Sequence, residues 1–315
     1  MSSVVITGAS RGIGRFAAQY LAIHPSHTHM VLLNRRTPVG LVDELRATGV
    51  DVSVIRVDLS SMRSVAQAAD EAADAVRSGR IPPIRTLVCN AGVQHTTALT
   101  ETVDGLEETF AVNVLANHLL LSGLRAHLTS QARVVVTVSD THFGDLRHNL
   151  GMVSGPRWRP VETLARVGAF PNAGSVRAGR TAYSTSKLAA IHLVHEHARR
   201  FPDGPTVLAF NPGFVPGTDL ARDADALSRF AMRRVMPALT LTPLATSPAR
   251  AGRLLADAAS GATAASSGAY IDRDRAAPSS PESYDPEREH QAWAAIETLI
   301  AEACNRPAAS DPPPT

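Results

Sequence analysis

The sequence contains very little lysine. Of its 31 basic residues, 30 are arginine, and Lys187 is the only lysine among 315 residues. Abundant arginine and alanine are typical of a GC-rich coding bias, which accounts for the ratio without a functional reason. Under such a bias, a lysine that persists indicates a position where arginine is a poor replacement. Lys187 is therefore the first candidate functional residue.

Other scarcities exclude whole classes of protein. Two cysteines, Cys89 and Cys304, rule out a disulfide framework and a cysteine-based zinc site, and they fit a reducing cytoplasm. The net charge of +2 is too small to indicate nucleic acid or a membrane surface as partner. No apolar run approaches about 18 residues, and the N-terminus lacks the basic start and cleavage site of a signal peptide. We therefore expect a cytoplasmic protein without a membrane anchor.

The sequence does contain an alternation of apolar strands and amphipathic helices. Such continuously apolar strands between helices predict a doubly wound parallel sheet of the α/β class, Rossmann-like, in one domain over residues 1–305. Two long segments interrupt the pattern, an insert at about 140–179 and a segment at about 214–248. The tail 306–315 is expected to be disordered. Strands are predicted at 3–7, 29–34, 51–57, 86–89, 133–138, 206–210 and 269–271, and helices at 12–22, 39–48, 61–76, 101–124, 181–200, 249–259 and 286–303.

The first strand leads directly into a glycine-rich turn that opens a helix. Gly8 permits the tight turn, Gly12 lets the backbone approach a pyrophosphate, and Gly14 allows the helix to pack closely on the sheet. The spacing is GxxxGxG rather than GxGxxG, so a purely structural turn is the alternative. The residues predicted to bind a dinucleotide here are Gly8, Ser10, Arg11, Gly12, Ile13 and Gly14.

The end of the second strand indicates which dinucleotide is bound. An acidic residue about 20 positions after the glycine turn would bind a ribose 2′-hydroxyl and favour NAD. This position is the neutral Asn34, and Arg35 and Arg36 follow it. Guanidinium groups suit a 2′-phosphate, and Arg11 adds another cation. Although arginine is also the ordinary surface cation of this chain, we expect NADP(H) to be preferred over NAD(H).

Tyr183 and Lys187 lie four residues apart at the start of a predicted helix and so share one face. A free phenol, with a pKa near 10, is a poor acid or base at neutral pH. Lowering its pKa to about 7 requires roughly 4 kcal/mol of differential stabilisation. A desolvated lysine and a positive nicotinamide would together supply this. The YxxxK pattern also arises by chance, but here it contains the only lysine of the chain.

Together these motifs resemble the short-chain dehydrogenase/reductase family over roughly residues 3–220. The resemblance implies that Asn113 holds a water leading to Lys187, and that Ser139 orients the substrate oxygen. It implies that Tyr183 transfers the proton, while Lys187 binds the nicotinamide ribose and lowers the pKa of Tyr183. Further cofactor contacts are implied for Asp58, Leu59, Asn90, Ala91, Gly92, Pro212, Gly213, Val215 and Thr218, the last of these one residue later than the common family spacing.

Looser matches resemble the retinol-dehydrogenase-like and protochlorophyllide-reductase-like branch. They are the helix sequence around Asn113 and His118, the long insert, and the C-terminal Ser283-Tyr284-Asp285 before a helix with Trp293. They imply a bulky apolar substrate and leave reduction of C=C open beside C=O. We hypothesise that the segment at 214–248 is an apolar lid over the substrate. An ordinary packed helical excursion is the alternative.

The predicted function is therefore an NADP(H)-dependent oxidoreductase. It would reduce the carbonyl, or oxidise the alcohol, of a medium-to-large apolar metabolite of secondary metabolism. Alternatives are reduction of C=C or C=N, a non-redox reaction on the same scaffold, and an NADP-sensing regulatory protein. The complete set of Asn113, Ser139, Tyr183 and Lys187 argues against the sensor.

Histidines elsewhere offer weaker leads. His192 and Glu196 lie one helical turn apart, but no metal-binding motif accompanies them, so we expect no metal and a surface or subunit-contact role. His142 and His148 lie near Ser139 in the sequence and are candidates for substrate contact. Relatives pair through helices that correspond to 101–124 and 181–200, which predicts a homodimer unless the insert and the C-terminal extension block that contact.

Overall fold

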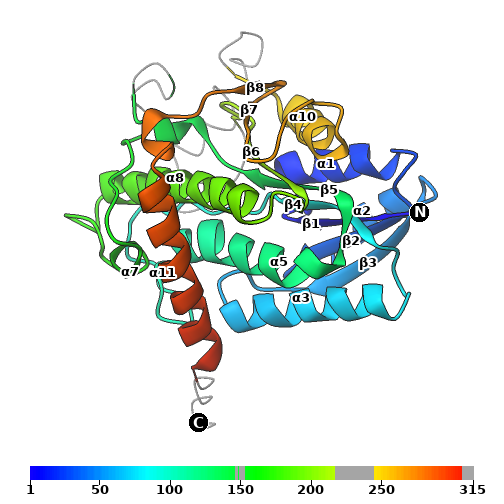
Figure 1. Cartoon of the computed structure of the whole chain (residues 1–315), viewed down its shortest axis with the longest axis horizontal. Helices are drawn as coiled ribbons and strands as arrows, with labels where there is room; N and C mark the ends of the chain where they lie inside the picture. Colours follow the sequence, from blue (N-terminus) through cyan, green and yellow to red (C-terminus); the bar gives the residue numbers. More distant parts are fainter. Residues whose placement is uncertain (146–147, 149–152, 217–244, 307–315) are drawn as a thin grey trace.

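The computed structural model describes residues 1–145, 148, 153–216 and 245–306. Its centre is an eight-stranded sheet in the order β3-β2-β1-β4-β5-β6-β7-β8 (Figure 1). Every neighbouring pair is parallel except β7 and β8. The predicted doubly wound parallel sheet is thus confirmed. The strands are β1 (Ser3–Thr7), β2 (His29–Asn34), β3 (Asp51–Arg56), β4 (Ile84–Cys89), β5 (Leu128–Thr137), β6 (Thr206–Asn211), β7 (Tyr270–Asp272) and β8 (Arg275–Ala277).

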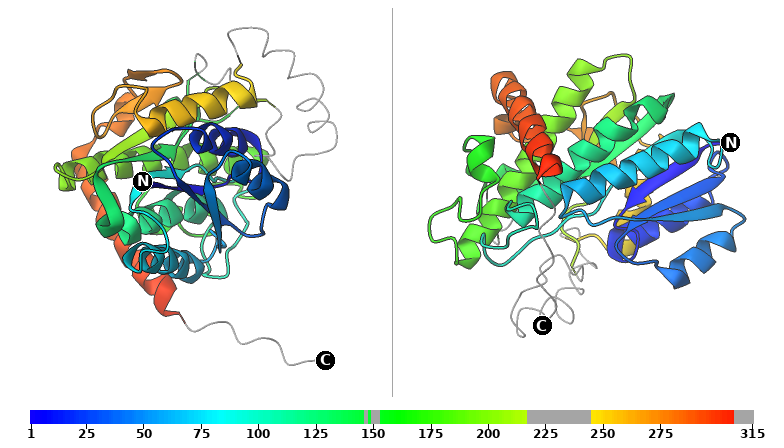
Figure 2. Two further views of the ribbon diagram at one scale, coloured as in Figure 1. Left: turned by 90° about the vertical axis from the view of Figure 1, so that its right-hand side faces the viewer. Right: turned by 90° about the horizontal axis from the view of Figure 1, so that it is seen from below.

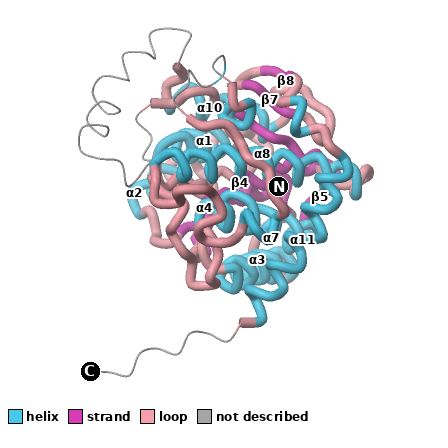
Figure 3. Tube along the Cα trace, turned by 90° about the vertical axis from the view of Figure 1, so that its left-hand side faces the viewer, coloured by secondary structure: helices cyan, strands magenta, loops and turns pink. Residues whose placement is uncertain are grey.

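Helices cover both faces of the sheet (Figures 1 and 3). One face carries α1 (Gly12–Ala22), α2 (Val39–Arg46) and α10 (Pro248–Ser260). The other carries α3 (Met62–Arg77), α4 (Glu108–Phe110), α5 (Ala116–Leu124) and α8 (Val176–Arg200). Outside this second layer, α11 (Pro286–Asn305) packs against α3, α8 and the short α7 (Val161–Leu164) (Figure 2).

The apolar strands are buried because both of their faces are covered. All five residues of β1 are buried, and successive side chains enter different cores. Val4 and Ile6 pack with α1 and α10, whereas Val5 packs with α3, α5 and α8. This arrangement explains why the strands read as continuous apolar runs rather than as alternating ones.

The predicted helix over 101–124 begins too early. Thr102 Oγ1 accepts hydrogen bonds from the backbone N–H groups of Asp104 and Leu106, and Gly105 has a φ of +73°. This tight turn competes with helix formation, so the helical backbone starts only at Glu108. Between α4 and α5, residues Ala111–Leu115 form a π-helical turn.

Other predicted boundaries also change. β5 begins at Leu128 and α8 at Val176, both five residues before their predicted starts, and α2 ends at Arg46. The antiparallel β8 was not predicted, because three residues are too few to show a periodicity. Most of the proposed lid at 214–248, part of the insert (146–147 and 149–152) and the tail 307–315 lie outside the described residues. Among the helices that the structure describes, none has the length and apolar character to cross a membrane.

The close contact between α1 and α10 predicts a loss of stability when a glycine in it is replaced. A Cβ on Gly252 of α10 would lie 2.4 Å from Phe16 Cβ and 2.8 Å from the Ile13 carbonyl oxygen of α1. We expect Gly252→Ala to lower the free energy of unfolding by about 2 kcal/mol through overpacking, as measured by chemical denaturation. The matched control is Gly40→Ala in α2, whose Cβ would have nothing within 4 Å and should not destabilise. Equal effects at the two positions would contradict this packing account.

Candidate active site

The carboxyl ends of the parallel strands meet at one edge of the sheet, which is where ligands bind in open α/β folds. At the end of β1, Gly8 and Gly12 have φ values of +70° and +57°. A Cβ on Gly14 would lie 2.2 Å from the Gly8 carbonyl oxygen, so only glycine fits there. The N-terminus of α1 has no side-chain cap, which leaves its backbone N–H groups directed toward the space beyond the turn.

Thr7 holds this turn against β4. Its Oγ1 accepts hydrogen bonds from the backbone N–H groups of Asn90 and Ala91, both at 3.0 Å. The Asn90 amide in turn donates to the Gly8 carbonyl oxygen at 3.4 Å. The structure therefore brings the predicted Asn90-Ala91-Gly92 segment against the glycine turn. The central acceptor is Thr7, the last residue of β1, for which no role was predicted.

The adenosine end of the predicted site lies at the neighbouring strands. Asn34 is the last residue of β2 and is buried, whereas Arg35 and Arg36 follow it and are exposed. Asp58, also exposed, lies just after β3, and its Oδ1 accepts two hydrogen bonds from Ser60. Because β1, β2 and β3 are parallel neighbours, these four residues lie at the same edge of the sheet as the glycine turn. The predicted phosphate-binding cations and the turn are therefore on one side of the molecule.

The predicted catalytic residues come together behind β4 and β5. Asn113, in the π-helical turn, accepts from the Val93 N–H at 2.9 Å and donates to the Val93 carbonyl oxygen at 2.9 Å and to Ser186 Oγ at 3.0 Å. The Asn113 carbonyl oxygen accepts from the Asn117 side chain at 2.8 Å. A Cβ on Gly92 would lie 3.1 Å from Asn113 Oδ1 and 3.5 Å from Lys187 Nζ, so Asn113 and Lys187 flank this glycine.

Lys187 is a buried ammonium. It is 3% exposed, and its one hydrogen bond among the described residues is donated to the Thr137 carbonyl oxygen at 2.8 Å. Burial lowers the pKa of Lys187 to about 8, because a charged group is costly in the interior. Nζ lies 5.5 Å from the centre of the Tyr183 ring, one helical turn earlier in α8.

Tyr183 is also buried. Burial raises the pKa of Tyr183, the Ser139 side chain lowers it, and the nearby Asp140 raises it further. Without a ligand, Tyr183 is therefore a protonated phenol at neutral pH. Ser139 lies two residues after the end of β5, close enough to Tyr183 to affect its pKa.

His142 has a structural role next to Ser139. Its Nδ1 donates to the Ser139 carbonyl oxygen at 2.6 Å, and its Nε2 accepts from the Ser280 N–H at 3.1 Å. These bonds require the neutral ring, and burial lowers the pKa of His142 to about 4. His142 thus ties the catalytic serine to the C-terminal segment. His148 stacks on Phe143, with ring centres 3.8 Å apart.

The nicotinamide end of the predicted site follows β6. Gly213 has a φ of +74°, and its N–H donates to Asn211 Oδ1 at 3.1 Å. A Cβ on Gly213 would lie 3.2 Å from Arg273 Nε, so the turn between β7 and β8 closely approaches the backbone here. Pro212 adjoins this turn and Val215 is buried beside it. Thr218 lies outside the described residues.

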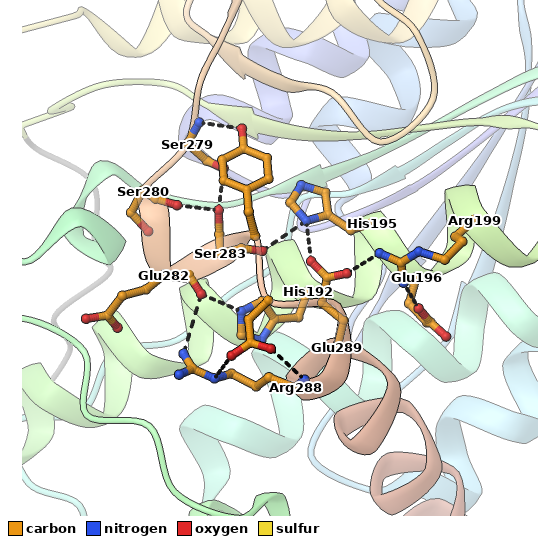
Figure 4. Close-up of polar contacts among 12 residues, drawn as sticks. His192, His195, Glu196, Arg199, Ser279, Ser280, Glu282, Ser283, Arg288 and Glu289 are labelled. Atoms are coloured by element: carbon orange, nitrogen blue, oxygen red, sulfur yellow. Dashed lines mark hydrogen bonds and ion pairs between the residues drawn. The ribbon is translucent and has the colours of Figure 1, made fainter.

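The polar residues at the end of α8 bind α11 (Figure 4). His195 Nδ1 pairs with Glu289 Oε1 at 2.7 Å, and Arg199 lies between Glu289 and Glu196 and contacts both. His192 Nε2 lies 3.2 Å from the Glu282 carbonyl oxygen. These contacts are intramolecular, and in the described part of the chain no three metal-ligating side chains gather into a metal site.

Comparison with known proteins identifies the family. The short chain dehydrogenase family matches residues 2–148. Protochlorophyllide reductase A from Triticum aestivum is 30% identical over 94% of this chain and 80% of its own length. A Streptomyces protein named as a candidate daunorubicin C-13 ketoreductase is 34% identical over 68% of this chain and 66% of its own. The human WW domain-containing oxidoreductase is 32% identical over 70% of this chain, which spans about half of that protein's length.

Solved structures agree on the fold. A carbonyl reductase from chicken fatty liver, bound to NADPH, superposes on this chain with a TM-score of 0.57 at 18% sequence identity. The match covers 88% of this chain and 98% of the carbonyl reductase chain. The chain belongs to the short-chain dehydrogenase/reductase family, whose members are oxidoreductases that use a nicotinamide cofactor.

The Thr7 contacts generate a testable expectation. Thr7→Val keeps the shape of the side chain but removes the acceptor of two N–H groups, so we expect the free energy of unfolding to fall by about 2 kcal/mol. NADPH should also bind more weakly, as measured by titration calorimetry. The control is Thr129→Val, because Thr129 Oγ1 has no hydrogen-bond partner among the described residues. If Thr7→Val were as harmless as the control, Thr7 would not hold the turn.

Proposed function

We propose that the protein is an NADPH-dependent reductase of a carbonyl group on a bulky apolar metabolite, with the alcohol as substrate of the reverse reaction. The observation that carries the proposal is the buried Lys187 ammonium, which lies beside Gly92 and one helical turn from the buried Tyr183. The carbonyl reductase with bound NADPH and the ketoreductase-like relative support this assignment.

The residues present fit a dinucleotide. A side chain at Gly14 would meet the Gly8 carbonyl oxygen, and the uncapped start of α1 offers N–H groups to a pyrophosphate. Arg35 and Arg36, exposed after β2, supply cations for a 2′-phosphate. Lys187 Nζ, a donor of up to three hydrogen bonds, has capacity left for ribose hydroxyls beyond its bond to Thr137.

A bound nicotinamide supplies the hydride, and the chain supplies the proton and the orientation. Because the pKa of Tyr183 is raised, its hydroxyl is a proton donor before the reaction. Ser139 and Tyr183 together would hold the substrate oxygen, and the Tyr183 proton would pass to that oxygen. Lys187 would then stabilise the phenolate that remains, aided by the positive charge of the oxidised cofactor.

Reduction of a C=C bond is a second candidate. The similarity to the wheat protochlorophyllide reductase extends over 94% of this chain, beyond the segment that carries the predicted catalytic residues. A panel of bulky ketones and conjugated alkenes, followed by NADPH absorbance, separates the two chemistries. Turnover of alkenes but of no ketone would replace the carbonyl proposal.

We further propose that the protein is a cytoplasmic homodimer. Its interface does not include the outer face of α8, because α11 of the same chain packs there. Sedimentation equilibrium tests this assembly, and a monomer at micromolar concentration would exclude it.

Replacing the single lysine tests the role of the ammonium. Lys187→Arg keeps the charge but not the compact shape, so we expect kcat for NADPH-dependent reduction to fall at least about 100-fold. The control is Arg250→Lys, which exchanges the same two residue types in the opposite direction at an exposed position and should leave kcat unchanged. Tyr183→Phe should lose a similar factor, whereas Tyr20→Phe on the surface of α1 should not. Near-native turnover of Lys187→Arg or Tyr183→Phe would disprove the mechanism.

Cofactor preference is tested at the end of β2. The double variant Arg35→Ser/Arg36→Ser should raise KM for NADPH about tenfold or more and change KM for NADH by less than about threefold. Arg46→Ala in α2 removes a nearby cation and controls for a general loss of positive charge. Equal losses with both cofactors would show that these arginines do not recognise the 2′-phosphate.

A further inference from the structure

Arg273 adopts a backbone conformation that arginine rarely takes. It lies in the two-residue turn between β7 and β8, and its φ is +59°. Among the described residues, Asn172 is the only other residue besides the glycines whose φ is positive. A bulky side chain is strained in this region, and a positive φ in a hairpin turn of this length favours glycine, asparagine or aspartate. The backbone alone would therefore favour one of these residues at position 273.

The Arg273 side chain lies on the turn at the nicotinamide end of the predicted site. A Cβ on Gly213 would lie 3.2 Å from Arg273 Nε and 3.4 Å from Arg273 Cδ. The side chain is 46% exposed, and its one hydrogen bond among the described residues is donated by Nε to Asp272 Oδ1 at 3.3 Å. A guanidinium carries further N–H donors on Nη1 and Nη2, for which the described part of the chain supplies no acceptor. These donors are available to a ligand.

A network of hydrogen bonds joins Arg273 to the turns that follow β5 and β6. Asn211, buried at the end of β6, accepts from the Gly213 N–H at 3.1 Å and from the Asp140 N–H at 3.2 Å. Its Nδ2 donates to Asp272 Oδ1 at 3.0 Å. The Arg273 N–H donates to the Asn211 carbonyl oxygen at 2.9 Å. The guanidinium is therefore held at the same edge of the sheet as the predicted catalytic serine and the predicted nicotinamide turn.

The charges at this edge indicate the kind of ligand. Asp140, which directly follows Ser139, and Asp272 place two carboxylates here. Burial raises the pKa of Asp140 to about 6, Asp272 raises it further and Arg273 lowers it, so the charge of the guanidinium reaches this end of the site. Two carboxylates repel an anionic ligand unless a cation offsets them. A guanidinium binds a carboxylate through paired N–H donors, which makes Arg273 the group that admits an acid here.

We propose that Arg273 is a specificity-determining residue that binds a carboxylate of the substrate. The proposal rests on the proposed function and narrows its substrate class to a bulky, otherwise apolar ketone that carries one acid group. Such a contact explains why arginine rather than glycine occupies a strained position. A phosphate of the cofactor offers the same chemistry from another source, and the first test separates the two.

The first test measures binding and needs no turnover. The probes are para-phenylbenzoate and para-phenylbenzamide, which share one apolar body, and each is titrated calorimetrically into the full-length protein saturated with NADP⁺. We expect the acid to bind at least about tenfold more tightly than the amide. Arg273→Gln should remove or invert this preference, because Asp140 and Asp272 then lack the cation. Arg275→Gln removes an exposed cation of β8 and should preserve the preference.

Equal binding of the two probes, or failure of both to bind, would overturn the proposal. A preference for the acid that survives Arg273→Gln, or that is lost equally in Arg275→Gln, would do the same. The Kd of NADPH should change by less than about threefold in Arg273→Gln. A large loss of NADPH affinity with an unchanged preference for the acid would assign the guanidinium to a cofactor phosphate, against the proposal.

The strain at position 273 is tested by stability. Arg273→Gly should unfold at a higher urea concentration than Arg273→Gln, because both lack the guanidinium but only glycine adopts a φ of +59° without strain. Equal midpoints would contradict the argument that arginine is kept here against the preference of the backbone.

The last test uses turnover and distinguishes this proposal from the proposed function. The ketones are para-benzoylbenzoate and its methyl ester, each reduced with NADPH. We expect kcat/KM to be at least about tenfold higher for the acid, and Arg273→Gln should remove this advantage mainly by raising KM. Equal kcat/KM for the two ketones would overturn the role of Arg273 and leave the carbonyl reductase intact. If no ketone of the panel is reduced while the binding preference holds, the proposed function fails and the carboxylate site stands.

Discussion

The site depends on one buried positive charge. Lys187 is 3% exposed, lies behind the glycine segment after β4, and donates its one described hydrogen bond to the Thr137 carbonyl oxygen of β5. No carboxylate within the described residues forms an ion pair with it. Backbone dipoles and a ligand must therefore stabilise the charge that water would solvate at the surface. The π-helical turn that carries Asn113 and the turn of α8 that carries Tyr183 are both arranged around this ammonium.

Most of the sheet and the residues of the candidate site could be predicted from the sequence, because both depend on local patterns. Apolar runs locate the strands, and the glycine turn and the Tyr183–Lys187 spacing mark the strand ends where ligands bind. The errors have local physical causes, as at Thr102 and Gly105, where a side-chain-capped turn delays the helix. The structural role of His142 was not predicted, because it depends on Ser280, which lies 138 positions away in the chain.

The C-terminal segment completes the arrangement from outside the sheet. The Ser280 N–H donates to one ring nitrogen of His142, and the other ring nitrogen donates to the Ser139 carbonyl oxygen. Glu289 of α11 binds His195 and Arg199 of α8. Both elements that carry catalytic candidates, the turn after β5 and α8, are thus fastened to the same 279–289 region. This explains in physical terms why the outer face of α8 is polar although it is covered, since its histidines and Glu196 have partners within the chain.

The central claim is that Lys187 is a buried ammonium whose charge the protein stabilises only in part, and that a bound dinucleotide supplies the remaining stabilisation. Because the chain has one lysine, ¹³C-lysine labelling gives a single side-chain resonance, and its titration needs no assignment. The account predicts a midpoint near pH 8 in the free protein, and a rise when NADPH is added, because ribose hydroxyls and phosphates favour the charged form. A midpoint at the ordinary lysine value, near 10.4, that does not respond to NADPH would contradict it.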